Sequence, residues 1–413
     1  MVRHIAIIAP PLAGHWDPLR VLALALQRRG VRVSFAHLPD ALRLLGDDAL
    51  ALIPVGALDL ARYEAVLIQA DSWPGVLRMI GETARFSEML LDTLPEALAG
   101  AGVDAIVADS TEPAGALVAR RLGLPFVTSV TGLPLLEDWR LPPPYVSWPY
   151  RRGFLANRRN RGGWRVTRLL MRPITDVVER TAQRWRIAEG AALSPRLIAA
   201  QCPPGLDFPR STLPAHFRYL GPWRRPGSTE LPLSDGRPLV YCSLGSLQGG
   251  RPALFADMAA ACAALGARAV IAHGGRLSEA DAASLPGDPI VRPFFHQPSV
   301  LAQCVAAILH AGFNTVLDAL AAGLPMITVP LAFEQPGTAA RAAWAGAAIT
   351  LEPKGLDAAR LQQALRQVLE EDRYRAAASR LKQEIGELGG VEQAADLTLS
   401  ALNEGVATTA SRG

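Results

Sequence analysis

The chain has 413 residues, a formal net charge of +4 and a hydrophobic share of 50%. This length favours two or three domains, the apolar share excludes an intrinsically disordered protein, and the small net charge does not favour a nucleic-acid-binding protein. The sequence has no run of about 18 apolar residues that would predict a transmembrane helix. The four cysteines have neither metal-ligand nor redox spacing, which indicates buried thiols in a reducing compartment, so we expect a cytoplasmic protein.

The N-terminal segment predicts a strand–turn–helix–strand unit. Residues 4–9 form a short apolar strand, residues 10–14 a turn, and Asp17-Pro18 an N-cap followed by a first-turn proline. A helix is expected at 19–29 and a strand at 31–36, and the pattern returns as strand, helix and strand at 103–109, 113–122 and 125–130. Strands that alternate with helices predict a parallel sheet covered on both faces.

The middle of the chain interrupts this pattern. Residues 139–193 carry few strand signals and predict a helix at 164–189. The proline-rich stretch 202–236 predicts an interdomain linker. Beyond it, alternation resumes, with strands expected at 238–243, 268–273, 305–309 and 325–330.

We therefore predict an α/β protein with two Rossmann-like, doubly wound domains. The expected limits are 1–220 for the N-terminal domain, 236–390 for the C-terminal domain and 391–413 for a final helix and tail. Two such domains in series face each other across a cleft lined by the carboxyl ends of their strands.

The strongest chemical signal lies where the strand at 305–309 runs into His310-Ala311-Gly312-Phe313-Asn314-Thr315 and a helix begins. Gly312 permits close backbone approach, and the helix N-terminus offers free N–H groups to a diphosphate. His310 is placed to reach a phosphate oxygen, and Asp318, one turn into the helix, is placed to hold a ribose diol. The competing interpretation is structural, because Thr315-x-x-Asp318 is also a capping box.

His15 and Asp109 are the candidate catalytic pair. His15 is expected in the turn after the first strand, and Asp109 ends another strand of the same domain, so both side chains should emerge at one sheet edge. An Asp behind a His fixes its tautomer and stabilises the imidazolium. The positive end of the following helix should help to keep His15 neutral and able to act as a base. On these residues alone, a coincidental pair is the competing interpretation.

A family resemblance supports both sites. The segments 294–301, 310–318, 323–326 and 330–335 resemble the donor-binding signature of the UDP-glycosyltransferases, which have the GT-B fold. Further matches resemble the bacterial zeaxanthin glucosyltransferases, among them Ala9-Pro10-Pro11, Gly123-Leu124-Pro125-Phe126, Leu206-Asp207-Phe208-Pro209-Arg210 and Ser243-Leu244-Gly245-Ser246. The resemblance covers most of the chain up to about residue 350 and is weakest at 139–189, where an acceptor pocket would be shaped. It implies UDP-glucose as the donor and a hydroxylated carotenoid such as zeaxanthin as the hydrophobic acceptor of the N-terminal domain.

The resemblance also implies roles for individual residues. Phe294 would stack on uracil, Gln297 would contact uracil or ribose, and Glu334 with Gln335 would read the sugar hydroxyls. The remaining donor contacts would come from Gly245, Ser246, His310, Gly312, Asn314, Thr315 and Asp318, with His15 as the base and Asp109 as its partner. The sequence departs from the family pattern in having Phe294 rather than Trp and Asp318 rather than Glu, which leaves the identity of the sugar open. No Asp-x-Asp pair occurs, so we expect no metal and no cofactor besides the sugar nucleotide.

The segment from Arg140 to Gly190 carries twelve arginines against three acidic residues, with aromatic residues between them. Such a surface beside the acceptor cleft suggests peripheral contact with anionic lipid at the inner membrane face. The competing interpretation is a solvated arginine-rich helical face. No binding module surrounds these arginines, so we do not expect nucleic acid.

Three other functions compete with a carotenoid glucosyltransferase. The same chemistry can act on a macrolide, polyketide or lipid, or use another nucleotide sugar. A nicotinamide dehydrogenase is disfavoured because the turn at 10–14 lacks the Gly-x-Gly-x-x-Gly spacing. A non-catalytic sugar-nucleotide-binding protein is disfavoured because His15, Asp109 and His310 are all present.

Overall fold

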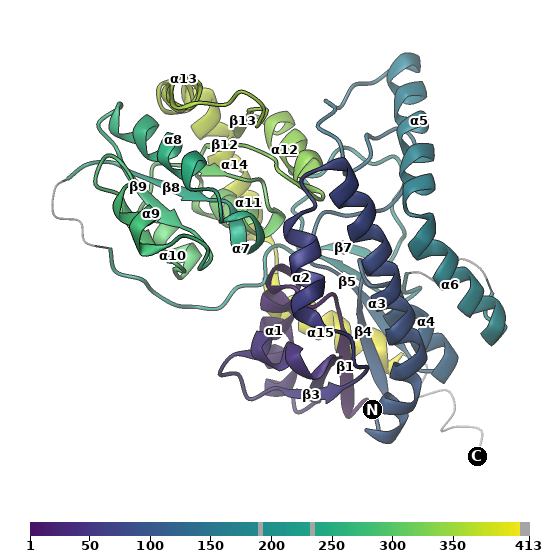
Figure 1. The fold of residues 1–413 in the computed structure, drawn as a ribbon. Helices are drawn as coiled ribbons and strands as arrows, with labels where there is room; N and C mark the ends of the chain where they lie inside the picture. The colour runs from purple at the N-terminus through teal and green to yellow at the C-terminus, as the bar shows by residue number, and fades with distance from the viewer. Residues whose placement is uncertain (189–192, 232–235, 405–413) are drawn as a thin grey trace.

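The computed structural model describes residues 1–188, 193–231 and 236–404. It contains two parallel sheets in series, each flanked by helices (Figure 1). The first sheet has seven strands in the order β3-β2-β1-β4-β5-β6-β7, and the second has six in the order β10-β9-β8-β11-β12-β13. Every strand pair is parallel, which confirms the predicted α/β class.

The first sheet and its helices use the N-terminal half of the chain. Its strands are β1 (His4–Ile8), β2 (Arg32–His37), β3 (Ala51–Pro54), β4 (Ala105–Asp109), β5 (Phe126–Val130), β6 (Ile198–Ala200) and β7 (Phe217–Tyr219). The α-helices between them are α1 (Ala13–Arg28), α2 (Leu60–Ile68), α3 (Trp73–Gly100), α4 (Pro113–Leu122), α5 (Phe154–Leu170) and α6 (Arg172–Trp185), and a 3-10 helix, η1, spans Pro39–Leu45.

The second sheet follows the interdomain segment. Its strands are β8 (Leu239–Ser243), β9 (Arg268–Ala272), β10 (Ile290–Arg292), β11 (Ala306–Leu309), β12 (Met326–Thr328) and β13 (Ala348–Thr350). Its helices are α7 (Gly245–Gln248), α8 (Pro252–Ala263), α9 (Glu279–Ala283), α10 (Gln297–Leu301), α11 (Phe313–Ala322), α12 (Gln335–Trp344), α13 (Ala358–Glu370) and α14 (Asp372–Glu387).

The last helix, α15 (Gly390–Asn403), returns to the first domain and packs against α1 (Figure 1). Arg29 at the end of α1 forms ion pairs with Glu392 and Asp396 of α15. The structure thus places this helix on the N-terminal domain. The predicted tail beyond it, residues 405–413, lies outside the described residues, as do Glu189 and Gly190.

The start of α1 corrects the sequence prediction. The helix was expected at 19–29 but begins at Ala13, because the carbonyl of Leu12 accepts hydrogen bonds from the N–H groups of His15 and Trp16, both over 2.9 Å. His15 therefore lies in the first helical turn rather than in a loop before the helix. Pro18, expected near the start, lies inside the helix.

Two further boundaries differ from the prediction. Helix α5 begins at Phe154 rather than near Trp164, and the predicted linker 202–236 contains the edge strand β7. A three-residue strand is too short to show an alternating pattern, and α5 has a low apolar content that hides its start.

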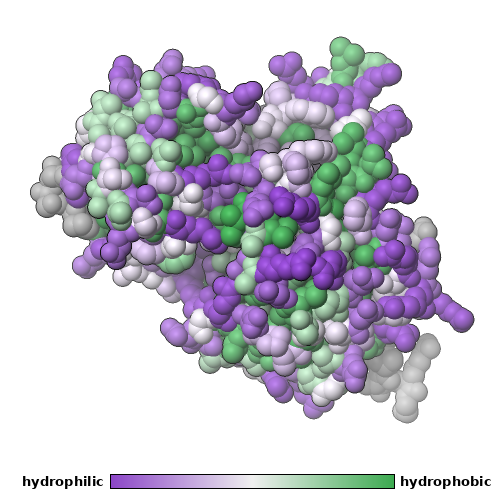
Figure 2. All heavy atoms as spheres, in the orientation of Figure 1, coloured by the Kyte–Doolittle hydropathy of each residue, from purple (hydrophilic) through white to green (hydrophobic). Residues whose placement is uncertain are grey.

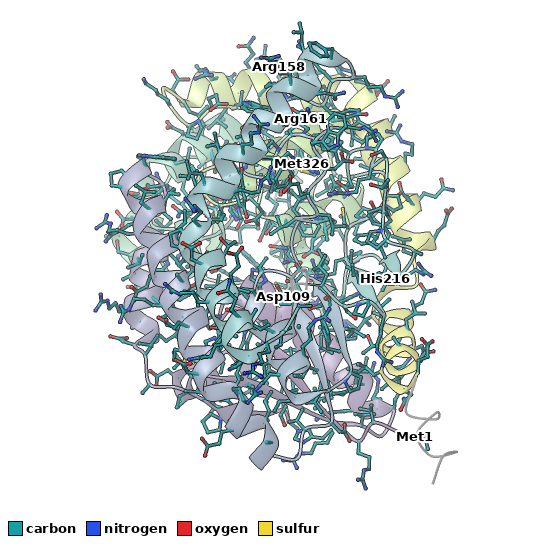
Figure 3. All side chains as sticks on the ribbon, turned by 90° about the vertical axis from the view of Figure 1, so that its right-hand side faces the viewer. Met1, Asp109, Arg158, Arg161, His216 and Met326 are labelled. Carbon is teal, nitrogen blue, oxygen red and sulfur yellow. The ribbon has the colours of Figure 1, made fainter. Side chains whose placement is uncertain are left out.

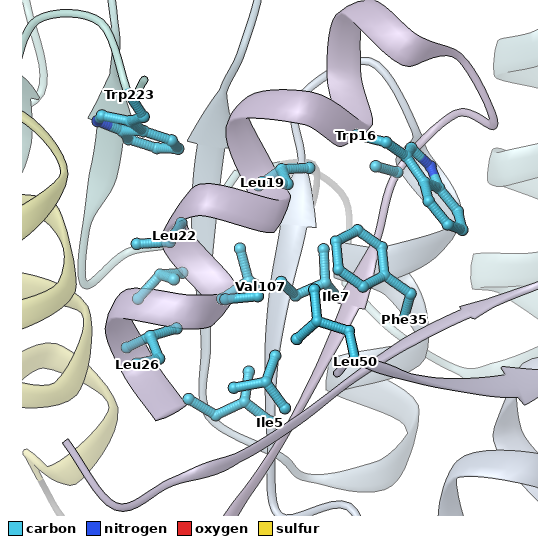
Figure 4. Packing of buried hydrophobic residues seen from close by; sticks show 14 of the residues in the cluster. Ile5, Ile7, Trp16, Leu19, Leu22, Leu26, Phe35, Leu50, Val107 and Trp223 are labelled. Atoms are coloured by element: carbon cyan, nitrogen blue, oxygen red, sulfur yellow. The ribbon is translucent and has the colours of Figure 1, made fainter. Parts of the chain in front are cut away.

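Helix α1 is fixed by its apolar face. Trp16, Leu19, Leu22 and Leu26 are buried against the first sheet, in the same core cluster as Ile7 of β1 (Figure 4). Residues spaced by three and four positions lie on one helical face, so this packing fixes the rotation of the helix. The rotation in turn decides where the neighbouring His15 points.

None of the helices in the part of the chain that the structure describes is both long and apolar enough to cross a bilayer.

Candidate active site

The candidate residues gather at the carboxyl edges of the two sheets. In the first sheet β1, β4 and β5 are neighbours, so the residues that end or follow them, including Asp109 and Thr131, meet at one edge. In the second sheet β8 and β11 are neighbours, which brings Gly245 and His310 together in the same way. Asp109 lies near the middle of the molecule, where the two domains face each other (Figure 3).

His15 and Asp109 form the predicted pair, with a third residue between them. The Nδ1 atom of His15 is 3.4 Å from Oδ1 of Asp109 but only 2.8 Å from the hydroxyl oxygen of Thr131. That hydroxyl donates to the other oxygen of Asp109 over 2.5 Å. An Nδ1–H therefore points at the Thr131 and Asp109 oxygens, which leaves Nε2 as the basic nitrogen.

Asp109 is held as a carboxylate. It is buried, and it accepts hydrogen bonds from the main-chain N–H and the hydroxyl of Thr111, over 3.0 and 2.5 Å. Burial alone would raise the pKa of Asp109, but His15 and the two threonine hydroxyls leave the pKa below its ordinary value. The negative charge is therefore retained beside the imidazole.

The pKa of His15 differs in direction from the sequence prediction. Burial lowers this pKa, but the charge of Asp109 and the hydrogen bond to it, with smaller effects of Glu334 and Glu112, leave it above the ordinary value. This net direction is opposite to the expectation that the helix end keeps the imidazole neutral, because the nearby carboxylates, Asp109 above all, outweigh the effect of burial. A base with a raised pKa binds the acceptor proton more strongly.

The His310 ring fills a gap between two glycines. It is buried, its Nδ1 lies 3.3 Å from the carbonyl oxygen of Ser243, and burial lowers its pKa to about 4. A Cβ atom added at Gly245 or Gly312 would lie only 2.6 or 2.3 Å from Nε2 of His310. Both positions therefore require glycine, and the ring edge with Nε2 faces the start of α11.

The loop before α11 is built for close approach. Ala311 has a φ of 64°, a conformation uncommon for residues other than glycine. Gly312 is the N-cap residue of α11, so Phe313, Asn314 and Thr315 form the first turn, whose N–H groups have no partner within the helix. This is the arrangement that accommodates a phosphate.

The Asn314 side chain joins the two domains. Its Nδ2 donates to the carbonyl oxygens of Gly14 and Thr131 over 2.7 and 3.3 Å, and its Oδ1 accepts from Arg224 over 2.8 Å. The side-chain amide of Asn314 is therefore already engaged, so only its main-chain N–H is left for the predicted diphosphate contact.

Asp318 lies in a buried hydrogen-bond network. Its Oδ1 pairs with Nε of Arg224 over 2.5 Å, and its Oδ2 accepts from Gln297 over 2.6 Å. Gln297 also accepts a hydrogen bond from the hydroxyl of Tyr241 over 3.2 Å. The structure thus brings the predicted uracil or ribose residues Gln297 and Asp318 together, but with Arg224 on the carboxylate.

The remaining predicted donor residues line the same edge. Phe294, in the loop after β10, is 68% exposed and so presents an open ring face. Ser246 is exposed in α7, and Thr315 is half-buried in the first turn of α11. Glu334 precedes α12 directly, and burial raises its pKa. Gln335 is buried and accepts from the N–H groups of Leu331 and Ala332, so its amide N–H groups remain as donors.

Sequence reasoning missed Thr131 and Arg224. Thr131 directly follows β5, the neighbour of β4, so strand order would have indicated it. Arg224 lies in the interdomain segment, and no sequence signal separates it from the adjacent Arg225. Among the residues that the structure describes, no three His, Cys, Asp or Glu side chains lie close enough to share a metal ion.

Comparison with known proteins identifies the family. Residues 258–388 match the family model described as "Erythromycin biosynthesis protein CIII-like, C-terminal domain". The chain is 35% identical to a zeaxanthin glucosyltransferase from Pseudescherichia vulneris, over 97% of this chain and 98% of that one. It is 29% identical to a demethyllactenocin mycarosyltransferase from Streptomyces fradiae, over 95% of this chain and 85% of that one.

Solved structures show the same architecture. The glycotransferase of kitacinnamycin superposes with a TM-score of 0.76 at 20% identity and covers 97% of this chain and all of that one. This likeness confirms the predicted GT-B fold. Together with the identity over nearly the full length, it shows that the chain is a glycosyltransferase enzyme that belongs to the family of the zeaxanthin glucosyltransferases.

Proposed function

We propose that this enzyme transfers glucose from UDP-glucose to a hydroxyl group of a hydroxylated carotenoid such as zeaxanthin, with inversion at the anomeric carbon. The observation that carries the proposal is the meeting of His15, Thr131 and Asp109 with the His310–Gly312 loop across one interface, bridged by Asn314. The zeaxanthin glucosyltransferase of Pseudescherichia vulneris, which is similar to this chain over nearly its full length, supports the choice of sugar and acceptor.

The second domain would bind the donor. The diphosphate would lie at the start of α11, against Gly245, Gly312 and the main-chain N–H groups of the first turn, with His310 beside it. Uracil would stack on the exposed ring of Phe294, and the ribose would share the network of Gln297 and Asp318. Glu334 and Gln335, at the start of α12, would bind sugar hydroxyls, and Ser246 and Thr315 would add hydroxyl donors to the phosphates.

His15 would act as the base. Its Nε2 would take the proton of the acceptor hydroxyl as that oxygen forms a bond to the anomeric carbon. The bond from that carbon to the diphosphate oxygen breaks on the opposite face, and its electron pair leaves with UDP. The helix N-terminus stabilises the departing charge.

Thr131 would act as a positioning residue. Its hydroxyl accepts from His15 and donates to Asp109, so the charge of Asp109 reaches the imidazole both directly and through this hydroxyl. The protonated His15 formed in the reaction would be stabilised by the same chain of hydrogen bonds. We propose no metal and no cofactor in these steps, since protein groups account for both the base and the stabilisation of the leaving group.

A second candidate function uses the same chemistry on another hydrophobic acceptor, such as a macrolide, polyketide or lipid, or with another nucleotide sugar. It is favoured by the similarity to a mycarosyltransferase over most of both chains. Phe294 in place of the family's Trp, and Asp318 in place of its Glu, are consistent with a different nucleotide sugar.

Mass spectrometry of the products would decide between these candidates. The enzyme would be incubated with UDP-glucose or dTDP-glucose and with zeaxanthin or a macrolide aglycone, in detergent. We expect hexosylated zeaxanthin from UDP-glucose in the largest yield. A product formed only from the macrolide, or only from dTDP-glucose, would overturn the carotenoid proposal or the donor assignment respectively.

A further inference from the structure

Helix α5 presents an exposed surface that is both apolar and cationic. Phe154, Leu155, Val166 and Leu169 are 77%, 79%, 56% and 62% exposed, although large apolar side chains are normally buried. The helix carries five arginines and no acidic residue. In the space-filling view a hydrophobic group, in green, projects at the upper right, where α5 lies in Figure 1, with hydrophilic residues, in purple, beside it (Figure 2).

These side chains share one side of the helix. Leu155 and Val166 are separated by about three helical turns, and Leu169 lies one turn beyond Val166. Arg158 lies between them on the same side, with Arg161 next to it (Figure 3). We call the surface formed by Phe154, Leu155, Arg158, Arg161, Arg165, Val166, Arg168 and Leu169 the α5 outer face.

The opposite side of α5 is firmly attached to the protein. The indole N–H of Trp164 donates to the carbonyl oxygens of Asp138 and Leu141, both over 3.0 Å. Asn160 donates to the carbonyl oxygen of Arg140 over 2.8 Å. The α5 outer face therefore stays exposed while the helix is held in place by its buried side.

The attached loop leads to the catalytic site. The segment 131–153 begins at Thr131, beside His15, and ends at α5. Along it, burial raises the pKa of Tyr145 to about 12, with a smaller contribution from the charge of Glu334. A Cβ atom at Gly337 would lie 2.1 Å from the carbonyl oxygen of Pro144. One loop thus connects the α5 outer face to the catalytic pair and to the start of α12.

A cationic hollow adds a second feature at the junction of α5 and α6. Arg165, Arg168 and Arg172 line it, together with Leu169, Thr175, Asp176 and Glu179. Three guanidinium groups around one hollow provide the planar donors that bind phosphate groups in pairs of hydrogen bonds.

We propose that the α5 outer face docks on an anionic lipid bilayer, with the arginines on lipid phosphates and the leucine, valine and phenylalanine side chains in the interfacial layer. A helix with apolar side chains flanked by arginines lies in the membrane plane in this way. The purpose of docking rests on the proposed function, because a carotenoid is dissolved in the bilayer and must leave it to reach His15. The binding itself does not depend on which acceptor is used.

Vesicle flotation tests the proposal directly. The full chain would be mixed with vesicles of phosphatidylcholine alone or of phosphatidylcholine with phosphatidylglycerol. We expect recovery with the anionic vesicles only, since the negative surface potential of such vesicles attracts arginines close to the bilayer. The variants Leu155→Ser/Val166→Ser/Leu169→Ser and Arg158→Gln/Arg165→Gln should each weaken binding roughly tenfold.

Matched controls come from exposed residues elsewhere. Leu42→Ser in η1 and Arg366→Gln/Arg375→Gln in α13 and α14 remove the same kinds of side chain and should float like the unaltered protein. Equal recovery with both vesicle types would overturn the proposal. So would unchanged flotation of the α5 variants, which would place the contact elsewhere, or binding to an acidic protein without any binding to vesicles.

An activity measurement separates this inference from the proposed function. With zeaxanthin in anionic vesicles the α5 variants should be at least several-fold slower, whereas with zeaxanthin in detergent micelles they should equal the unaltered enzyme. If the unaltered enzyme floats but glycosylates no zeaxanthin in micelles, the proposed acceptor is wrong and membrane docking stands. If it glycosylates zeaxanthin but does not float, the docking proposal alone is wrong.

Discussion

Asn314 of the second domain donates a hydrogen bond from Nδ2 to the main-chain oxygen of Gly14 in the first, over 2.7 Å. That oxygen is available because the residue four positions later in α1 is Pro18, which has no N–H to close the helical turn. Pro18 thus leaves the carbonyl of Gly14, the residue before His15, without a donor from the helix. Asn314, from the segment that would hold the diphosphate, donates to this carbonyl instead. One side chain therefore links the base to the donor site.

We expect Asn314→Asp to break this link. The carboxylate keeps the shape of the side chain but cannot donate, so a negative charge would face the carbonyl oxygens of Gly14 and Thr131. The Gly14 oxygen is exposed and can bond to water, but leaving the buried Thr131 oxygen unpaired costs about 1–3 kcal/mol, so kcat/KM should fall roughly tenfold. Asn157→Asp in α5, also half-buried, is the control and should retain activity in detergent. Unchanged kcat/KM in Asn314→Asp would show that the bridge has no functional role.

Thr131→Val should lower kcat with little effect on the donor KM. Valine has a similar shape but cannot connect His15 to Asp109, so the imidazole loses a hydrogen-bond acceptor and the carboxylate a donor. We expect kcat to fall by about 10- to 100-fold, because the hydrogen bonds that orient the catalytic base are broken while the base itself is retained. Thr131→Ser keeps the hydroxyl and should restore most of kcat. If the serine variant is as slow as the valine variant, Thr131 acts through packing and not through its hydroxyl.

Donor binding should be coupled to a proton at His310. In the free enzyme its pKa is about 4, and an Nδ1–H that donates to Ser243 leaves Nε2 without a proton. To donate to a diphosphate from Nε2 while keeping the Ser243 bond, the ring must be protonated, so binding must raise this pKa. UDP-glucose affinity should then rise as the pH falls from about 8 to about 5, because the bound state holds the extra proton.

Calorimetry without acceptor measures this coupling. Titrations of UDP-glucose in two buffers of different ionisation enthalpy should show net proton uptake near neutral pH, and His310→Gln should abolish it. No uptake by the unaltered enzyme would mean that the neutral ring donates from Nε2 and gives up the bond to Ser243.

Arg224 and Asp318 should be energetically coupled. Their pair is largely buried, with side chains 20% and 5% exposed, so removing one partner leaves the other uncompensated. Arg224→Gln and Asp318→Asn should each lower the free energy of unfolding by about 2 kcal/mol, and the double variant by much less than the sum. The exposed pair Arg28–Glu392 is the control and should show almost no coupling in the same urea titrations. Additive losses for Arg224 and Asp318 would contradict the network.

The sequence was informative where local pattern determines structure. Strand β1, helix α4 with its left-handed Gly123 cap, and the strand-to-helix passage at His310 were predicted within a residue or two. Periodicity and terminal glycines or prolines are local signals, and the alternation of strands with helices predicts a parallel sheet. The meeting of His15 with Asp109 was predicted on the same basis.

What could not be predicted depends on contacts between distant segments. The pairing of Arg224 with Asp318 joins the interdomain segment to α11, and no spacing indicates it. The start of α1 at Ala13 was hidden by Pro18, which is typical of a first turn but here lies inside the helix. The Gly14 carbonyl that Pro18 leaves without a helical donor accepts from Asn314 of the other domain instead. The net direction of the pKa of His15 depends on the balance between burial, which lowers it, and the Asp109 carboxylate, which raises it, with smaller effects of Glu334 and Glu112, which the fold brings near.

The most direct test of the proposed carotenoid glucosyltransferase activity is the product formed from UDP-glucose and zeaxanthin. Mass spectrometry combined with the anomeric proton coupling in NMR should show zeaxanthin carrying one or two glucose residues in the β configuration, inverted from the α-linked donor. His15→Ala should form that product orders of magnitude more slowly while still binding UDP. An α-linked glucoside, absence of any glucoside, or full activity of His15→Ala would contradict an inverting glucosyl transfer to zeaxanthin with His15 as the base.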